Sequence, residues 1–147
     1  NKNAKEDDNS LQTAQESDLI KGVKVLLVED NDLNMEIAEF ILENEGAIVT
    51  KAWNGQQAVD IFRESKPGDI DVILMDLMMP ELNGIQATKL IRSMNRADAS
   101  TIPIIAMTAN AFKEDMEMSR EAGMNEHLAK PLDSQKIITT IAKYIKK

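Results

Sequence analysis

The sequence predicts a doubly wound α/β fold, in which helices cover both faces of a five-stranded parallel sheet of order 2-1-3-4-5. Two observations lead to this prediction. Five short apolar runs alternate with stretches whose apolar residues recur at helical spacing. The runs are also almost continuously apolar, which is typical of strands covered on both faces. Because each helix returns the chain to the start of the next strand, the strands are parallel and the crossovers right-handed.

The first unit begins with the run VKVLLV at Val23–Val28, which predicts a buried strand that stops at two acidic residues. A helix follows over Leu33–Glu45, and Gly46 stands where helices often end. Apolar residues recur along this helix at helical spacing: Leu33, Ile37 and Ile41, with Ala38 and Leu42 beside them.

The second unit places a strand at Ala47–Ala52 and a helix that Asn54 caps. The helix carries three apolar residues: Ala58, Ile61 and Phe62. In the third unit, a strand at Asp71–Met75 runs into Asp76, and Gly84–Asn95 is a helix. Its inward residues are expected to be Ala87, Leu90, Ile91 and Met94.

The last two units complete the pattern. The fourth has a strand at Ile102–Met107 and a helix over about Ala111–Ala122, with Gly123 after it. The fifth has a short strand at Asn125–Ala129 and a helix at Ser134–Ile145. Five such units with the predicted strand order describe a flavodoxin-like (βα)5 sandwich.

Residues 1–22 differ from the remainder of the chain. They are polar and charged, and their few apolar residues lack a sustained period. Such a stretch cannot bury enough apolar area to offset its ordering entropy. It is predicted to be a linker, disordered or partly helical around Leu11–Ile20, ahead of one domain at 23–147. The chain begins at Asn1 rather than at a methionine, which indicates a fragment of a longer protein.

Composition excludes several classes of function. The 147 residues carry 25 acids against 17 bases, and this net charge of −8 disfavours nucleic-acid binding. Cysteine is absent and His127 is the one histidine, so thiolate catalysis and multi-histidine metal sites are excluded. No apolar run approaches the ~20 residues that span a bilayer. The segment is therefore expected to be cytoplasmic and to make no membrane contact.

Polar side chains follow four of the predicted strands. They are Glu29 and Asp30 after the first strand, Asp76 after the third, Thr108 after the fourth and Lys130 after the fifth. Ligands of such sheets bind at the carboxyl ends of the strands, near the switch point between strands 1 and 3. Any one of these residues alone would be read as a loop cap or a solvated charge. Because all of them directly follow a predicted strand, together they predict one site.

The chemistry of the site follows from its charges. Three carboxylates at one edge raise one another's pKa unless a cation lies among them. Oxygen ligands, few in number, suit a Mg2+ ion that keeps several waters and shares a phosphate. Lys130 suits a phosphoryl oxygen, and Thr108 can donate a hydrogen bond to another. A carboxylate can itself be the nucleophile and form an aspartyl phosphate, with positioning and charge neutralisation supplying most of the rate.

Four motifs at these positions resemble those of the receiver domain of bacterial-type response regulators. The motifs are VLLVEDN, DVILMDLMMPELNG, PIIAMTA and KPLD, and the resemblance covers Val23–Lys147. It implies that Asp76 is the phosphoacceptor. It also implies that Glu29, Asp30 and Asp76 are the Mg2+ carboxylates, with the backbone carbonyl of Met78 as a further ligand.

The resemblance implies further roles around the acceptor. Thr108 is the switch hydroxyl and Lys130 the phosphate-contacting lysine, followed by a cis bond to Pro131. The switch ring, usually Tyr or Phe, is His127 here, and two interpretations stay open: a ring that turns inward, or an exposed histidine at a strand end. Met78 and Asn110 flank the path of an attacking water, where Met78 would hinder it and Asn110 would orient it. Alternatively, Met78 simply packs under its loop.

The amino-acid sequences of these motifs are most similar to those of receivers fused behind histidine kinases. The donor would then be the phosphohistidine domain of a kinase, and the partner a histidine phosphotransfer protein. The domain itself would catalyse only its own phosphorylation and dephosphorylation, whereas the parent would be a hybrid protein-histidine kinase. The docking face is expected on the first helix, with Asn34 and an exposed Met35, beside the loops near Asp76 and Pro131.

Three other functions compete with this hypothesis. A stand-alone single-domain regulator would signal through its fourth helix, fifth strand and fifth helix. A Mg2+-dependent aspartyl phosphatase usually needs a second acid two residues after the nucleophile, where this chain has Met78. A phosphorylation-dead scaffold would lack residues that are all present here. Dinucleotide binding is disfavoured because no G-x-G-x-x-G follows the first strand.

Overall fold

The computed structural model describes residues 19–79, 82–109 and 113–145. In these parts of the chain five strands alternate with five helices. In chain order they are β1 (Lys24–Val28), α2 (Asp32–Asn44), β2 (Ile48–Ala52), α3 (Gly55–Glu64), β3 (Val72–Asp76), α4 (Gly84–Arg92), β4 (Ile104–Thr108), α5 (Lys113–Ala122), β5 (Glu126–Ala129) and α6 (Ser134–Ile145). No helix within the described ranges is long and apolar enough to cross a bilayer.

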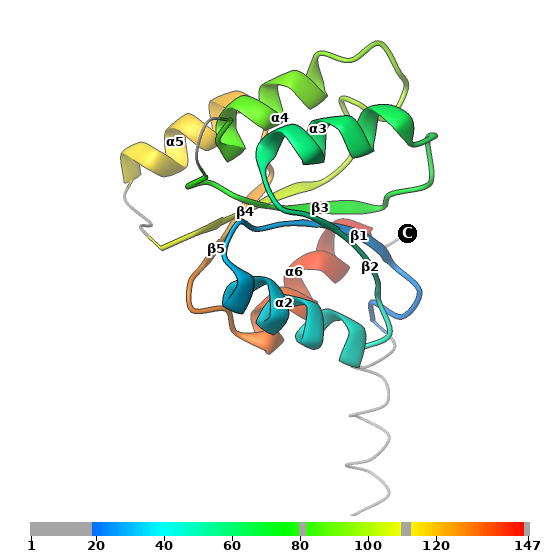
Figure 1. Cartoon of the computed structure of the whole chain (residues 1–147), viewed down its shortest axis with the longest axis vertical. Coiled ribbons are helices and arrows are strands. Elements are labelled where there is room, and N and C mark those ends of the chain that lie inside the picture. The colour runs from blue at the N-terminus through cyan, green and yellow to red at the C-terminus, as the bar shows by residue number, and fades with distance from the viewer. Residues whose placement is uncertain (1–18, 80–81, 110–112, 146–147) are drawn as a thin grey trace, which may run out of the picture.

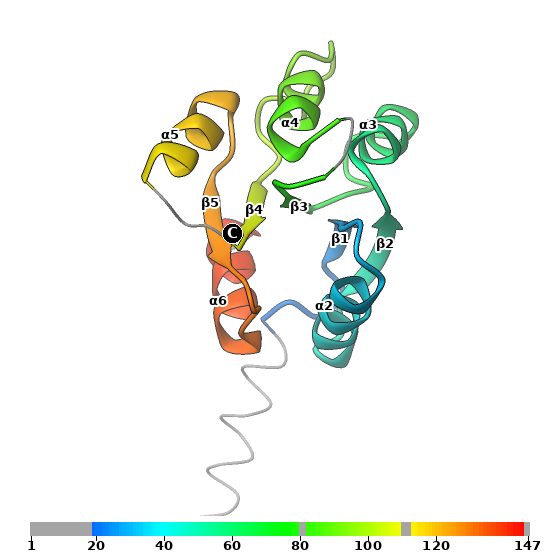
Figure 2. The same cartoon turned by 60° about the vertical axis from the view of Figure 1, so that its left-hand side comes forward.

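All neighbouring strands pair in parallel, and their order is β2-β1-β3-β4-β5. This confirms the predicted flavodoxin-like doubly wound sheet. Helices α3, α4 and α5 cover one face of the sheet, and α2 and α6 cover the other (Figure 1). After 60° of rotation the two helix layers still lie on opposite sides of the strands (Figure 2). Strands β1, β3 and β4 are central, and their side chains are buried almost throughout.

The core consists of two clusters, one on each face of the sheet. Phe62 and Ile91 belong to the cluster beneath α3 and α4, and Leu42 and Ile141 to the cluster beneath α2 and α6. Ile20 is fully buried in the second cluster, although it precedes the predicted start of the domain. Residues 1–18 lie outside the described part of the chain, so the linker assignment for 1–22 stays a prediction.

Three helices begin directly after an asparagine. Asn31, Asn54 and Asn83 each accept a hydrogen bond from the backbone N–H three residues on, at 2.8–2.9 Å. An asparagine at this position satisfies one of the free N–H groups of the first turn, and its loss costs about 1 kcal/mol. The cap at Asn54 was predicted. The caps at Asn31 and Asn83 are more important for the position of the acidic residues, because α2 and α4 begin beside these residues.

The apolar residues that recur at helical spacing on the first helix do not share one buried face. Leu33 and Ile37 are exposed, and the buried residues of α2 are Met35, Ala38 and Leu42. The predicted exposure of Met35 is therefore wrong, because this side chain packs fully into the core. Helix α2 carries apolar residues at helical spacing on two sides, and periodicity alone does not distinguish them.

Two details of the third unit also differ from the prediction. Leu90 was expected to face inward, but it is exposed on α4, whereas Ala87 and Ile91 are buried. The helix ends at Arg92 rather than at residue 95, and Ser93 forms its C-cap. The chain then turns toward β4 through a loop that places Arg96 against the end of α3.

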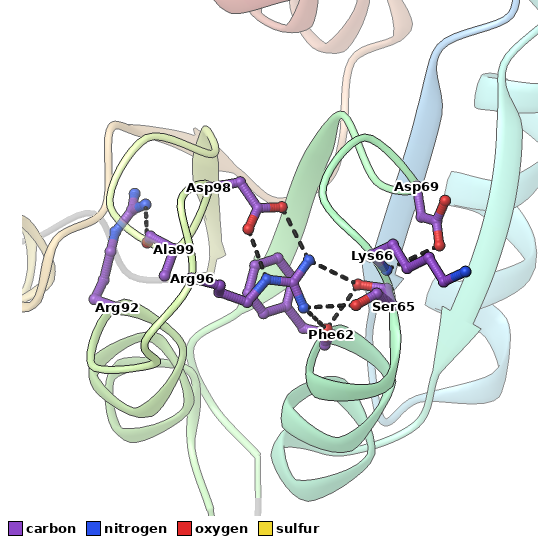
Figure 3. A network of polar contacts seen from close by, with 8 residues as sticks. All are labelled: Phe62, Ser65, Lys66, Asp69, Arg92, Arg96, Asp98 and Ala99. Atoms are coloured by element: carbon purple, nitrogen blue, oxygen red, sulfur yellow. Dashed lines mark hydrogen bonds and ion pairs between the residues drawn. The ribbon is translucent and has the colours of Figure 1, made fainter.

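Arg96 ties this loop to α3 through a polar network (Figure 3). Its guanidinium donates to the carbonyl oxygens of Phe62 and Ser65 at 2.6 and 2.7 Å. It pairs with both carboxylate oxygens of Asp98 at 2.6 and 3.0 Å, and it lies 4.2 Å from the centroid of the Phe62 ring. A cation is stabilising at a helix C-terminus, because the last carbonyls there lack intrahelical partners.

We expect Arg96→Ala to lower the free energy of unfolding by about 1–2 kcal/mol, because the network consists of charge-assisted hydrogen bonds that are largely shielded from water. Arg63→Ala is the matched control, since Arg63 forms an exposed pair with Asp60 at 2.8 Å. Such a surface pair contributes at most about 1 kcal/mol. Urea unfolding of both variants measures the difference, and equal losses would contradict the assigned role of Arg96.

Candidate active site

The carboxyl ends of β1, β3, β4 and β5 bring the predicted polar residues to one edge of the sheet. The register places the end of β1 level with the end of β3, through the pair Val28–Met75. Asp76 pairs with Met107, and Thr108 follows directly on β4. Thr108 in turn pairs with Ala129, whose next residue is Lys130. Parallel pairing alone therefore brings together side chains from four separate parts of the sequence.

Three carboxylates form a cluster at this edge. One oxygen each from Glu29, Asp30 and Asp76 lies within 4.8 Å of the other two. Glu29 and Asp76 are buried, whereas Asp30 is exposed. An ion could therefore be held from one side by protein oxygens and keep waters on the other. This donor set fits Mg2+, which prefers hard oxygen ligands and retains part of its hydration shell.

Lys130 lies against the same cluster. Its Nζ is 2.9 Å from Glu29 Oε1 and 3.2 Å from Asp76 Oδ2. Burial lowers the pKa of Lys130, but the hydrogen bond to Glu29 and the charges of both carboxylates outweigh it and raise that pKa. The ammonium is therefore held in its charged form next to Asp76. A phosphoryl oxygen at Asp76 would find a compact positive charge in place.

Burial raises the pKa of the Asp76 carboxyl to about 7, and the negative charge of Glu29 contributes in the same direction. The charge of Lys130 and a hydrogen bond from the Met78 N–H, 3.2 Å from Asp76 Oδ1, oppose this rise only in part. Two buried carboxylates facing one lysine leave an excess of negative charge. The cluster therefore favours an additional cation on electrostatic grounds.

The backbone around the carboxylates is closely constrained. The N–H of Asn31 donates to Glu29 Oε2 at 3.3 Å, while the Asn31 side chain caps α2. On the other side, the N–H of Gly84 donates to the carbonyl oxygen of Leu77 at 3.2 Å. A Cβ on Gly84 would lie 2.3 Å from the backbone oxygen of Asp76. The first turn of α4 can therefore approach the Asp76 backbone only because residue 84 has no side chain.

The remaining predicted residues lie at varied distances from this cluster. The N–H of Lys130 donates to the Thr108 carbonyl at 2.8 Å, and the Lys130–Pro131 bond is cis, as the resemblance implies. The Met78 side chain is 70% exposed, so it does not pack under its loop. Asn110 lies outside the described residues. The roles inferred for these residues stay predictions.

His127 is half-buried, and its ring contacts α5 rather than the carboxylate cluster. Its Nε2 forms a hydrogen bond with the hydroxyl of Ser119, a residue that is fully buried on α5. Sequence reasoning did not single out Ser119. A serine within an amphipathic helix carries no signal of its own, because only tertiary packing places it opposite a ring on β5.

The fold and the site together define a phosphoacceptor domain with a Mg2+-binding acidic cluster. Residues 25–142 match the family model described as the response regulator receiver domain. The chain belongs to this family, and it is thus a phosphoacceptor domain of two-component signalling.

Two curated relatives represent two kinds of parent protein. The chain is 41% identical over 128 residues to hybrid signal transduction histidine kinase I of Dictyostelium discoideum, an alignment that covers 83% of this chain and 7% of the kinase. It is 37% identical over 121 residues to the polar-differentiation response regulator DivK of Brucella anthropi, covering 82% of this chain and 94% of that protein. The chain thus spans a small part of one relative and nearly the whole of the other.

Two solved structures are similar in both sequence and fold. The receiver domain of a sensor histidine kinase from Pseudomonas aeruginosa, which has a magnesium ion coordinated in its active-site cleft, is 38% identical with a TM-score of 0.77, over 86% of this chain and 99% of that one. The receiver domain of Ssk1 from Saccharomyces cerevisiae, solved with the histidine phosphotransfer protein Ypd1, is 31% identical with a TM-score of 0.74, over 85% and 90% of the two chains.

Proposed function

We propose that this chain accepts a phosphoryl group from a phosphohistidine onto Asp76, while Glu29, Asp30, Asp76 and the Met78 backbone carbonyl hold Mg2+. The observation that carries the proposal is the position of Asp76. This carboxylate lies at the end of a central strand, within 4.8 Å of two further acids and 3.2 Å from the Lys130 ammonium. It contacts both a positive charge and a backbone N–H donor, as Glu29 also does, but Asp76 is the acid that ends a central strand.

In this reaction an oxygen of Asp76 forms a bond to phosphorus as the phosphorus–nitrogen bond of the donor breaks, and the histidine nitrogen keeps the electron pair. Lys130 neutralises one phosphoryl oxygen, and the Thr108 hydroxyl donates to another. Bound Mg2+ would supply further neutralisation of the charge on the transferred group. Water can later attack the acyl phosphate, beside the exposed side chain of Met78.

Intact-protein mass spectrometry tests this proposal. After incubation with acetyl phosphate and Mg2+, we expect the wild type to gain the mass of one phosphoryl group, and we expect EDTA to prevent the gain. Asp76→Asn should show no gain under either condition, because an amide oxygen is a poor nucleophile. Asp71→Asn is the control, since Asp71 lies near the opposite end of the same strand. A phosphorylated Asp76→Asn protein would place the acceptor elsewhere.

We further propose that the domain is the receiver of a hybrid histidine kinase in the cytoplasm. The support is the 41% identity to a kinase of that kind, together with the similarity of the motifs. The stand-alone regulator remains the second candidate, because the identity to DivK is almost as high and the coverage of that protein nearly complete. The full-length gene decides between them, since a hybrid kinase must encode a phosphohistidine domain and a nucleotide-binding domain.

The partner is proposed to be a histidine phosphotransfer protein or the phosphohistidine domain of a kinase, docked on α2. Three apolar residues form one exposed stripe on this helix: Leu33, Ile37 and Phe40. Beside the stripe lies a cleft of about 240 Å³, lined by Asn34, Ile37, Lys130, Pro131 and Leu132. An exposed apolar surface next to the Lys130 loop suits a helical partner that must bring its phosphohistidine to Asp76.

We expect Ile37→Asp to slow phosphoryl transfer from a phosphorylated phosphotransfer protein at least tenfold, which corresponds to about 1.4 kcal/mol. A charge in the stripe must be desolvated on docking. Phosphorylation by acetyl phosphate should be unchanged. Leu90→Asp is the matched control, because Leu90 and Ile37 are 42% and 43% exposed and lie on opposite faces of the sheet. Equal effects of the two changes on transfer would reject the docking face.

A further inference from the structure

A buried serine on α5 contacts the ring of His127 on β5. The Ser119 side chain is 0% exposed, and its hydroxyl forms a hydrogen bond with Nε2 of the half-buried imidazole. Successive side chains of a strand point to opposite faces, so the neighbouring Glu126 points toward α6 instead. There Glu126 binds the Tyr144 hydroxyl at 2.6 Å and the Lys143 ammonium at 3.2 Å. Of these two side chains, only that of His127 faces α5.

Helix α5 is held at a second point by Arg92 of α4. The Arg92 guanidinium donates to the carbonyl oxygen of Gly123, just beyond the end of α5, at 3.0 and 2.7 Å, and to Asn125 Oδ1 at 3.0 Å. This contact holds the C-terminal end of α5 against α4. The contact between Ser119 and His127 lies one turn earlier and joins the helix to the sheet. The two contacts therefore attach α5 to different partners.

Strand β5 connects His127 to the active site. His127 pairs with Ala106 on β4, and three residues later the same strand delivers Lys130 to Glu29 and Asp76. The Lys130 N–H also donates to Thr108 at 2.8 Å. A phosphoryl group on Asp76 would interact with Lys130 and Thr108, and these two residues flank the end of β5. A short strand paired with β4 therefore links His127 to the end that carries Lys130.

We propose that Ser119 is a positioning residue for His127: its hydroxyl holds the imidazole against α5 and so couples the position of α5 to the state of the phosphoacceptor site. The coupling rests on the proposed function of Asp76, whereas the positioning of the ring does not. The assignment gives the His127 ring a defined hydrogen-bonding partner on another element, namely Ser119 of α5. It also explains why a histidine can occupy a position where related domains usually carry Tyr or Phe, since an imidazole nitrogen can bond to a buried hydroxyl.

Two charged groups lie near the ring, Arg120 on α5 and Glu126 on β5. Burial and then Arg120 lower the pKa of His127, while Glu126 raises it less strongly. The ring is therefore neutral at pH 7. A neutral imidazole carries one N–H and one acceptor nitrogen, and a hydroxyl can accept from the first or donate to the second. The Ser119 hydroxyl therefore stabilises Nε2 in whichever role this nitrogen takes, and loss of the hydroxyl should change the tautomer ratio.

Nitrogen-15 NMR of the metal-free domain at pH 7.5 tests the positioning. His127 is the one histidine of the chain, so its ring signals need no assignment. We expect Ser119→Ala to change the ring nitrogen shifts and the tautomer ratio relative to the wild type. Ser119→Thr, which retains a hydroxyl, should keep the wild-type pattern. Ser100→Ala, at an exposed serine, is the control. Unchanged ring signals in a folded Ser119→Ala protein would overturn the proposal.

The coupling is tested by adding Mg2+ and beryllofluoride, a phosphoryl analogue. In the wild type we expect amide shifts both at Leu77, beside the acceptor, and at Met118 and Ala122 on α5. In Ser119→Ala the shift at Leu77 should persist and those on α5 should be lost. Equal α5 shifts in both proteins would overturn the coupling. If the analogue shifts no signal in the wild type, the proposed function of Asp76 fails instead, while the tautomer experiment still decides the positioning.

Discussion

Asp76→Asn is expected to make the metal-free domain more stable than the wild type by about 2–3 kcal/mol at pH 8. The buried Asp76 carboxylate faces Glu29, and its pKa is raised to about 7, so its ionised form is unfavourable in the folded state. An asparagine keeps the shape and the hydrogen bond from the Met78 N–H but removes the charge. A shift of one pKa unit corresponds to about 1.4 kcal/mol, so the shift at Asp76 sets an upper bound of about 4 kcal/mol.

The sign of the pH dependence follows from proton binding. Because the folded state holds this proton up to about pH 7 and the unfolded state releases it near pH 4, folding favours the protonated carboxyl between these values. The contribution of Asp76 to stability is therefore greatest at low pH and is lost as the pH rises toward 7. The stability advantage of Asp76→Asn should grow from pH 4 to pH 7 and then stay constant.

Urea unfolding of both proteins between pH 4 and pH 8, in EDTA and in excess Mg2+, measures this effect. Mg2+ should stabilise the wild type above pH 7 and stabilise Asp76→Asn much less, since the variant offers one carboxylate fewer. Asp71→Asn serves as the control for the loss of one negative charge. A variant that is less stable than the wild type in EDTA at pH 8 would show that the buried carboxylate is already neutralised by Lys130.

Gly84→Ala is expected to damage both stability and phosphorylation. The added Cβ would lie 2.3 Å from the Asp76 carbonyl oxygen and 3.0 Å from the Leu77 Cα, and both are backbone atoms that cannot rotate away. Either α4 or the end of β3 must then move. Overpacking of this kind typically costs 1–3 kcal/mol, and we expect about 3 kcal/mol because no flexible side chain absorbs the strain.

The same change should slow phosphorylation by acetyl phosphate at least tenfold, because it shifts the backbone that carries Asp76 relative to Glu29 and Lys130. Unfolding in urea and the initial rate of mass gain measure the two effects. Lys89→Ala, at an exposed position of the same helix, is the control and should change neither. A Gly84→Ala protein with wild-type stability and rate would mean that α4 can retreat freely from the acceptor.

Both the fold and the clustering of the acidic residues at one edge of the sheet were predictable from the sequence. Continuous apolar runs and helical periods alternate five times, and this pattern permits few arrangements other than a parallel sheet. Once the strands are parallel, their carboxyl ends share one edge. The residues that follow them, from Glu29 to Lys130, then have to meet, and the three predicted carboxylates do lie together. These conclusions depend on chain topology and need no knowledge of side-chain packing.

The helix surfaces were decided by tertiary packing. Apolar residues on two sides of α2 satisfy the same period, and only the docking of the helix on β1 and β2 buries Met35 and leaves Ile37 exposed. Leu90 was misassigned for the same reason. A hydrophobic period describes a helix by itself, whereas burial depends on the direction from which the rest of the molecule approaches it.

Long-range polar contacts were likewise decided by the tertiary structure. Arg96 reaches the end of α3 from a separate loop, and Ser119 meets His127 across two elements. Neither pair has a characteristic spacing, because each depends on how far a loop extends and how a helix is rotated. The raised pKa of Asp76 has the same origin, since it results from burial and from the charge of Glu29 on another strand. The sequence by itself thus determined which polar residues meet at one edge of the sheet, and the folded structure determined the charge environment of Asp76 and which surfaces remain exposed.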